Sequence, residues 1–148
     1  MSEPGSLPIA IACDHAGLDL KESLKQVLTK LSLGFVDLGT HTTASIDYPD
    51  YAHAVASGVA EHRFKLGVLV CGTGLGMSMA ANRHKGVRAA VCSDAYSARM
   101  ARQHNDANVL CLGSRVVGAG LAEDILTAFC STAFEGGRHA ARVAKIER

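Results

Sequence analysis

The sequence contains no tryptophan, only 5% of its residues are aromatic, and its formal net charge is +1. Proteins that bind nucleic acids usually have a clear excess of basic residues, and those that bind single strands stack the bases on aromatic side chains. This chain has 15 Lys and Arg against 14 Asp and Glu, so it offers neither feature. We therefore expect no nucleic acid among its partners.

Long apolar runs and paired cysteines are missing as well. The longest uncharged run, residues 66–82, contains four glycines, which is unfavourable for a membrane helix. The N-terminal residues lack the basic region of a signal peptide. The five cysteines, an odd number, include no C-x-x-C pair, which disfavours a disulfide framework and a zinc site. These features predict a reduced, cytoplasmic protein without a metal and without a membrane partner.

The pattern of apolar residues predicts an α/β fold. Short apolar runs typical of buried strands lie at residues 8–13, 35–38, 66–71, 87–92 and 109–112. Helical patterns follow them at residues 20–31, 51–60 (capped by Asp50), 94–103 and 121–129, with a short helix after residue 76 and a last basic helix at about 138–148. This alternation predicts a doubly wound, three-layer sandwich with a five-stranded parallel sheet, in a single domain spanning residues 1–148 with a C-terminal helical extension.

A glycine-rich turn follows the third predicted strand, where ligands bind in such sheets. Its sequence is Cys71-Gly72-Thr73-Gly74-Leu75-Gly76. Closely spaced glycines let a backbone approach a ligand and turn several N–H groups towards it, and a helix that begins there favours negative charge. The turn does not match G-x-G-x-x-G or a P-loop, and Met77 stands where a Cys-x5-Arg phosphatase loop needs arginine. We therefore expect an anion-stabilising loop of another kind.

The position of Cys71, at the end of the third predicted strand, favours a reactive thiol. A thiol at a strand end beside a helix N-terminus can have its pKa lowered from about 8.5 towards neutrality, so its thiolate can act as a base or nucleophile. We interpret Cys92, Cys111 and Cys130 as small apolar core residues. Cys13 also ends a predicted strand, and we expect it to belong to the core.

Other polar residues are expected at the same sheet edge. Asp14 and His15 follow the first strand, and Tyr48 lies in the long segment after the second. Asp14 could instead simply cap the next helix, and His15 could be a solvated loop residue. Their proximity to the glycine-rich turn favours the functional interpretation.

Three arginines are candidates for binding an anion. Arg138 and Arg142 are four residues apart and share a helix face, and Arg115 follows the fifth strand. The alternative is an ordinary solvated basic helix.

His104 and Asn105 end the fourth predicted helix and precede the fifth strand, so they should lie at the opposite sheet edge from Cys71. Either these two residues are structural, or they complete the site of a neighbouring subunit across a two-fold interface. The second interpretation predicts an obligate dimer.

Six blocks together resemble a known family over nearly the whole chain, in the same order. The blocks are Asp14-His15-Ala16-Gly17, Asp47-Tyr48-Pro49, Cys71-Gly72-Thr73-Gly74-x-Gly76, Arg102-Gln103-His104-Asn105-Asp106, Gly113-Ser114-Arg115 and Glu135-Gly136-Gly137-Arg138-His139. They resemble ribose-5-phosphate isomerase type B, of the ribose/galactose isomerase family.

The resemblance implies an aldose–ketose isomerase of the pentose phosphate pathway, which interconverts D-ribose 5-phosphate and D-ribulose 5-phosphate without metal or organic cofactor. It also implies a Rossmann-like sandwich that forms homodimers, sometimes tetramers, with sites shared between subunits.

The resemblance assigns a role to each matching residue. Cys71 would move the proton between C2 and C1, and His104 would assist opening of the furanose ring. The segment from Gly72 through Thr73, Gly74 and Leu75 to Gly76 would hold the enediolate, with Thr73 helping proton exchange between the sugar oxygens. Asp14, Tyr48 and Asn105 would contact sugar hydroxyls, and His15, Arg115, Arg138 and Arg142 would surround the phosphate. Some members use a Glu just after the glycine loop in place of the Cys, whereas this chain has Cys71 and Met77 and resembles the Cys-dependent members.

Three alternatives stay open at this stage. The substrate could be a hexose 6-phosphate such as allose or galactose 6-phosphate, although galactose-type enzymes pair two different subunits and this chain keeps Cys71, His104 and the arginines. The chain could be a non-catalytic sensor of a sugar phosphate or nucleotide, which would need the anion site but not Cys71. A redox-sensor role for Cys71 is the least favoured, because no resolving cysteine is close in sequence.

Overall fold

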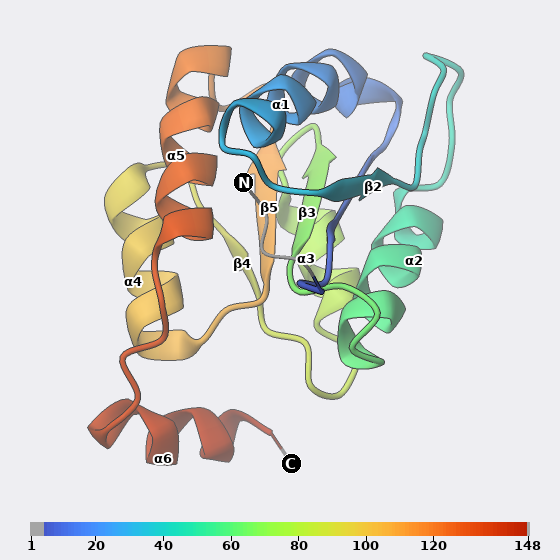
Figure 1. Cartoon of the computed structure of the whole chain (residues 1–148). Helices are drawn as coiled ribbons and strands as arrows, with labels where there is room; N and C mark the ends of the chain where they lie inside the picture. The colour runs from blue at the N-terminus through green and yellow to red at the C-terminus, as the bar shows by residue number, and fades with distance from the viewer. Residues whose placement is uncertain (1–4, 148) are drawn as a thin grey trace.

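The computed structural model describes residues 5–147, so residues 1–4 and 148, at the two ends of the expected domain, lie outside it. Five parallel strands form one sheet in the order β2-β1-β3-β5-β4 (Figure 1). The strands are β1 (Ile9–Cys13), β2 (Phe35–Asp37), β3 (Gly67–Cys71), β4 (Ala89–Val91) and β5 (Val109–Gly113). The expected five-stranded parallel sheet is thus confirmed.

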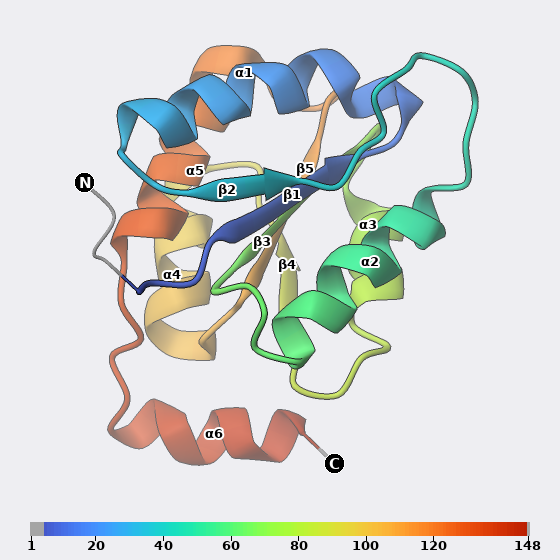
Figure 2. The ribbon, with the colours of Figure 1, turned by 45° about the vertical axis from the view of Figure 1, so that its right-hand side comes forward.

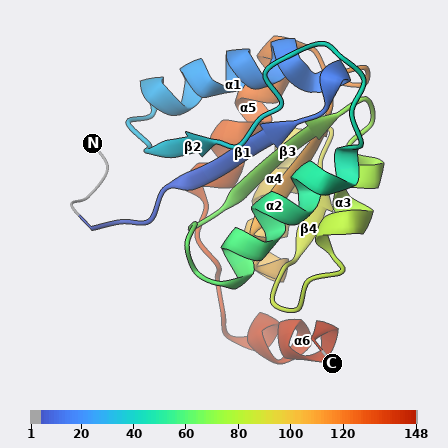
Figure 3. The ribbon, with the colours of Figure 1, turned by 90° about the vertical axis from the view of Figure 1, so that its right-hand side faces the viewer.

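Helices cover both faces of the sheet, which confirms the doubly wound sandwich (Figure 3). They are the 3-10 helix η1 (His15–Gly17), α1 (Leu18–Lys30), α2 (Tyr48–Ala60), α3 (Leu75–Ala81), α4 (Ala95–Asn105), α5 (Ala119–Ser131) and α6 (Arg138–Ile146). Helices α1, α4 and α5 pack on one face, and α2 and α3 on the other. None of these helices is long and apolar enough to span a membrane.

Alternation along the buried strands divides the core in two. In β1, Ile9 and Ile11 face the core under α1, α4 and α5, whereas Ala10 and Ala12 face the core under α2 and α3. Successive side chains of a strand point to opposite faces, so a strand buried on both sides must be apolar throughout. The continuous apolar runs of β1, β3 and β5 are therefore explained by their central positions.

Two elements differ from the sequence expectation. Helix α2 begins at Tyr48 rather than after Asp50, because Pro49 fits the first turn of a helix, where its missing N–H costs nothing. Strand β4 covers only residues 89–91 of the expected 87–92, because it is the edge strand and pairs with β5 alone. The Asn82 side chain hydrogen bonds to both backbone groups of Ala89, the amide donating to O at 3.0 Å and Oδ1 accepting from N at 2.8 Å.

The expected C-terminal helix is present as α6, and it extends away from the sandwich (Figure 2). It lies beyond the amino ends of the strands, near the end of α4. Gly136 and Gly137, both with positive φ, turn the chain into it. His139 is the buried residue of this helix, while Arg138 and Arg142 are exposed.

Candidate active site

The carboxyl ends of β1, β3 and β5 bring the first group of expected site residues to one sheet edge. Cys13 ends β1 and Cys71 ends β3, where Cys71 pairs with Gly113 of β5. Asp14, which follows β1, is buried, and its Oδ1 accepts hydrogen bonds from the backbone N–H groups of Ala16 at 2.9 Å and Gly17 at 3.1 Å. Asp14 therefore does cap the next helix, and that cap fixes its carboxylate at this edge.

The glycine-rich turn folds tightly around the sulfur of Cys71. The Gly74 N–H donates to Sγ at 3.1 Å, and the Cys71 side chain is nearly buried. Gly74 has φ of +80°, and a Cβ there would lie 3.1 Å from the carbonyl carbon of Leu112. Glycine is needed here because both the left-handed conformation and the close approach to β5 disfavour a side chain. The turn thus places a thiol directly beneath the N-terminus of α3.

The side chain of Tyr48 covers part of this turn. A Cβ on Gly76 would lie 2.5–2.7 Å from atoms of the Tyr48 ring, so the phenol rests directly on the glycine. The N–H of Ile46 donates to His15 Nδ1 at 3.3 Å, which ties the segment before α2 to the end of β1. Tyr48 and His15 are therefore both at the Cys71 edge, as expected.

The guanidinium of Arg115 lies over the same turn. Its Nη1 is 3.3 Å from the position that a Cβ on Gly72 would take, and its backbone N donates to the Gly72 carbonyl at 3.0 Å. None of the salt bridges within residues 5–147 involves Arg115. Its positive charge is thus available beside the loop for an anion such as a phosphate.

Three of the other cysteines, Cys13, Cys92 and Cys111, have raised pKa values. Burial raises the pKa of Cys13 to about 11, although the nearby Lys21 ammonium opposes this, and its Sγ points to the Thr40 carbonyl oxygen at 3.8 Å. Burial likewise raises the pKa of Cys92 to about 11 and that of Cys111 further. These thiols stay protonated near neutral pH, which agrees with their interpretation as core residues.

The second group of expected site residues lies at the opposite sheet edge. Helix α4 ends at Asn105, just before Val109, which pairs with Gly67 at the start of β3. Four steps along a strand separate Gly67 from Cys71, a rise of about 13 Å. His104 and Asn105 are therefore not brought to Cys71 within one chain, as the sequence indicated. Arg138 and Arg142 lie in α6 at the same far edge, so within one chain Arg115 does not join them around one anion.

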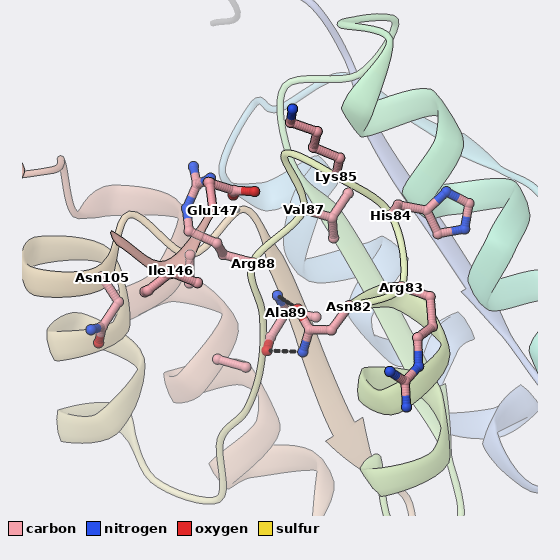
Figure 4. A pocket seen from close by; sticks show the side chains of 12 residues that line it. Asn82, Arg83, His84, Lys85, Val87, Arg88, Ala89, Asn105, Ile146 and Glu147 are labelled. Carbon is pink, nitrogen blue, oxygen red and sulfur yellow. Dashed lines mark hydrogen bonds and ion pairs between the residues drawn. The ribbon is translucent and has the colours of Figure 1, made fainter. Parts of the chain in front are cut away.

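A cavity of about 570 Å³ opens at that second edge, between the α3–β4 segment, the end of α4 and the end of α6 (Figure 4). Its lining includes Asn105, Arg83, Lys85 and Ile146. Arg88, also in the lining, donates to Glu147 at 2.9 Å. The cavity contains none of the residues around Cys71, so it is not the pocket of the thiol.

One cluster at this edge was not anticipated. His104, Glu135 and His139 place one potential metal-ligand atom each within 4.8 Å of one another. However, the two imidazoles are stacked, with ring centroids 4.3 Å apart and planes inclined by 13°. Nitrogen lone pairs lie in the ring planes, so nearly parallel stacked rings do not direct them at one ion. The sequence places His139 beside Arg138 but carries no signal of its burial against His104.

The chain has close relatives among known proteins. The family model described as Ribose/Galactose Isomerase matches residues 9–146. Ribose-5-phosphate isomerase B of Escherichia coli is 49% identical over 138 residues, 93% of each chain.

Solved structures agree in fold over the same length. The ribose-5-phosphate isomerase B of Clostridium thermocellum has a TM-score of 0.92 and 49% identity, covering 95% of each chain. That of Mycoplasma genitalium, solved with bound ribulose-5-phosphate, has a TM-score of 0.91 and 46% identity, covering 95% of this chain and 94% of the other. Sequence, fold and the glycine-rich turn at the end of β3 thus agree, and the chain belongs to the ribose/galactose isomerase family.

Proposed function

We propose that this protein is an aldose–ketose isomerase that interconverts D-ribose 5-phosphate and D-ribulose 5-phosphate, with Cys71 as the base. The observation that carries the proposal is the thiol of Cys71 at the base of the glycine-rich turn, with Arg115 above it and Tyr48 on its flank. Relatives at 46–49% identity bear the name of this enzyme, and one was solved with ribulose-5-phosphate.

The arrangement suits proton transfer through an enediolate. The Cys71 thiolate removes the proton from C2 of the open-chain aldose, and the C–H electron pair forms the C1–C2 double bond while the aldehyde oxygen becomes negatively charged. Backbone N–H groups of the turn stabilise that oxygen, and such donors contribute about 10²–10³-fold each. The proton then returns to C1, and the O2 proton passes to O1 with help from the Thr73 hydroxyl, which gives the ketose. No electron leaves the substrate, so the reaction needs no redox cofactor.

The phosphate end of the substrate accounts for the basic residues at the Cys71 edge. A phosphate monoester carries roughly −1.5 to −2 charges near neutral pH. Arg115 and His15 lie at this edge and supply its first contacts. Remote binding of this kind orients the reacting carbons over the base.

A homodimer completes the site in this proposal. One subunit supplies Cys71 and its turn, and the partner supplies His104, Asn105, Arg138 and Arg142 from its opposite edge. The exposed position of α6 and the apolar side chains of Leu75 and Met79, 52% and 64% exposed on α3 beside the turn, support such an association. We propose a cytoplasmic homodimer that acts in the pentose phosphate pathway without metal.

A turnover assay with D-ribose 5-phosphate in EDTA tests the reaction and its base. We expect ketopentose formation by the wild type, loss of turnover with retained binding in Cys71→Ala, and unchanged turnover in Cys130→Ala, a cysteine of α5. Turnover only of allose or galactose 6-phosphate would replace the substrate but keep the mechanism. Binding of ribose 5-phosphate without turnover by the wild type would refute catalysis and favour the sensor.

Mixing two inactive variants tests the shared site. Cys71→Ala and His104→Ala subunits that exchange form heterodimers in which one site is intact and the other carries both substitutions. Random exchange should restore roughly a quarter of the wild-type activity, because half of the dimers are mixed and each has one good site. No recovery after demonstrated exchange would refute sharing of the site.

A further inference from the structure

His139 occupies an unusual position in the second group of residues. It is the buried residue of a helix whose other residues are exposed or half-buried, and only 5% of its surface is exposed. Its Nε2 is buried and makes no hydrogen bond within the described residues. A buried polar atom without a partner is unfavourable, so a role beyond filling space is a reasonable expectation.

The ring of His139 lies against the ring of His104. The two imidazoles stack at 4.3 Å between centroids with planes 13° apart. The backbone supports this contact, because the N–H of Glu135 donates to the carbonyl of Gln103 at 3.1 Å and the N–H of His139 donates to that of Gly136 at 3.0 Å. The segment that leads into α6 is therefore attached to the last turn of α4, and the stacked pair adds a side-chain contact at that junction.

We propose that His139 is a positioning residue for His104. Its buried ring holds the plane of the His104 imidazole and docks α6 against α4, so that His104, Arg138 and Arg142 approach the sugar phosphate as one unit. This inference rests on the proposed function, in which His104 helps to open the furanose ring of the substrate.

The charges around the stacked pair favour a neutral His139. Burial lowers the pKa of His139, and the positive charges of His104, Arg138 and Arg142 lower it further, while Glu135 opposes them. His139 is therefore neutral near neutral pH. A neutral His139 ring can stack on His104 without charge repulsion, and in the proposed reaction His104 is the member of the pair that exchanges a proton with the sugar.

The test compares His139→Ala, which removes the stacked ring, with His139→Phe, which keeps a flat ring but cannot titrate. Lys145→Ala, at an exposed position of the same helix, is the control. For each variant kcat, KM and the primary isotope effect on kcat are measured with ribose 5-phosphate carrying deuterium at C2. Circular dichroism confirms that each variant is folded.

We expect kcat of His139→Ala to fall by about 10- to 100-fold, because small misplacements of a catalytic group have effects of this size. Its isotope effect should fall towards 1, because ring opening precedes removal of the C2 proton and would then limit the rate. His139→Phe should keep most of kcat and the wild-type isotope effect, and Lys145→Ala should match the wild type.

Wild-type kcat in His139→Ala, or a lower kcat with an unchanged isotope effect, would refute the positioning role. So would a Phe variant as impaired as the Ala variant. These results leave the proposed function intact, whereas a wild type that does not isomerise ribose 5-phosphate refutes that function and this role together.

Discussion

A buried lysine stabilises the segment that leads to the Cys71 edge. Lys21 of α1 is fully buried, and its ammonium donates to Asp37 Oδ1 at 2.7 Å and to the Thr40 carbonyl at 2.6 Å. These contacts join α1 to the end of β2, from which the chain continues to Tyr48. The substitution Lys21→Met keeps the approximate length of the side chain and removes the charge.

The loss of stability expected for Lys21→Met depends on the hydrogen bonds that Asp37 keeps. Breaking a buried ion pair by removing one partner costs about 3–5 kcal/mol. Asp37 keeps donors from Lys25 at 2.9 Å and from the Gly39 N–H at 2.9 Å, so its charge is not left isolated. We therefore expect the lower end, a loss of about 3 kcal/mol in the free energy of unfolding. Lys25→Met, whose side chain is 26% exposed, should cost about 1 kcal/mol or less.

The same network gives the protein a pH dependence. Burial opposes ionisation of Asp37, but hydrogen bonds from Lys21, Lys25 and the Gly39 N–H outweigh it and lower the pKa of Asp37 to about 2. The pKa in the folded state is below that of the unfolded chain, so this stabilisation is complete above about pH 4 and is lost as the pH falls towards 2. It amounts to roughly 2 kcal/mol for a shift of this size.

Urea unfolding followed by circular dichroism measures these effects. At pH 7 the midpoint of Lys21→Met should fall well below that of Lys25→Met at equal m-values. The difference between wild type and Lys21→Met should narrow as the pH is lowered from 4 to 2. Equal, small losses in the two variants at pH 7 would show that the buried ammonium of Lys21 contributes no more to stability than the partly exposed one of Lys25, contrary to this prediction.

Three further substitutions have distinct expected results. Gly76→Ala should push aside the ring of Tyr48, which is 39% exposed and can rotate towards solvent. KM should therefore rise several-fold while the melting temperature hardly changes, and a large fall in melting temperature would contradict this expectation. Gly17→Ala places a Cβ 2.7 Å from a backbone carbonyl of β3, so we expect a loss of about 2 kcal/mol or more in urea unfolding, and wild-type stability would show that the helix can shift. Asn82→Ala removes both hydrogen bonds to Ala89, so the free energy of unfolding should fall by about 1–2 kcal/mol. The unpaired edge of β4 should also promote association, which sedimentation measures. A variant with the stability and sedimentation of the wild type would show that Asn82 does not protect this edge.

The sequence predicts the fold and the location of the thiol because both depend on periodic, local signals. Continuous apolar runs mark strands buried on both faces, and the rule that ligands bind at the carboxyl ends of parallel strands places Asp14 and Cys71 together. The short β4 was not predicted, because its length depends on having a single neighbour. The burial of His139 depends on where the glycine-containing segment before α6 brings the chain back to α4, and no periodicity in the sequence predicts that position.

The division of residues between the two sheet edges follows from the topology itself. In a parallel sheet every strand presents its carboxyl end at the same edge, so a loop after β3 can meet loops after β1 and β5 but not the last turn of α4. A single chain can therefore place the anion-stabilising turn and one arginine around the proposed base, Cys71. It cannot bring the proposed ring-opening acid, His104, to the same edge. The proposed reaction needs that acid as well as the base, because a cyclic sugar has no free carbonyl to activate the C2 proton. A helix that extends beyond the sandwich and carries two arginines is the element that a second copy would need to deliver the missing groups, and its buried side chain, His139, stacks on His104.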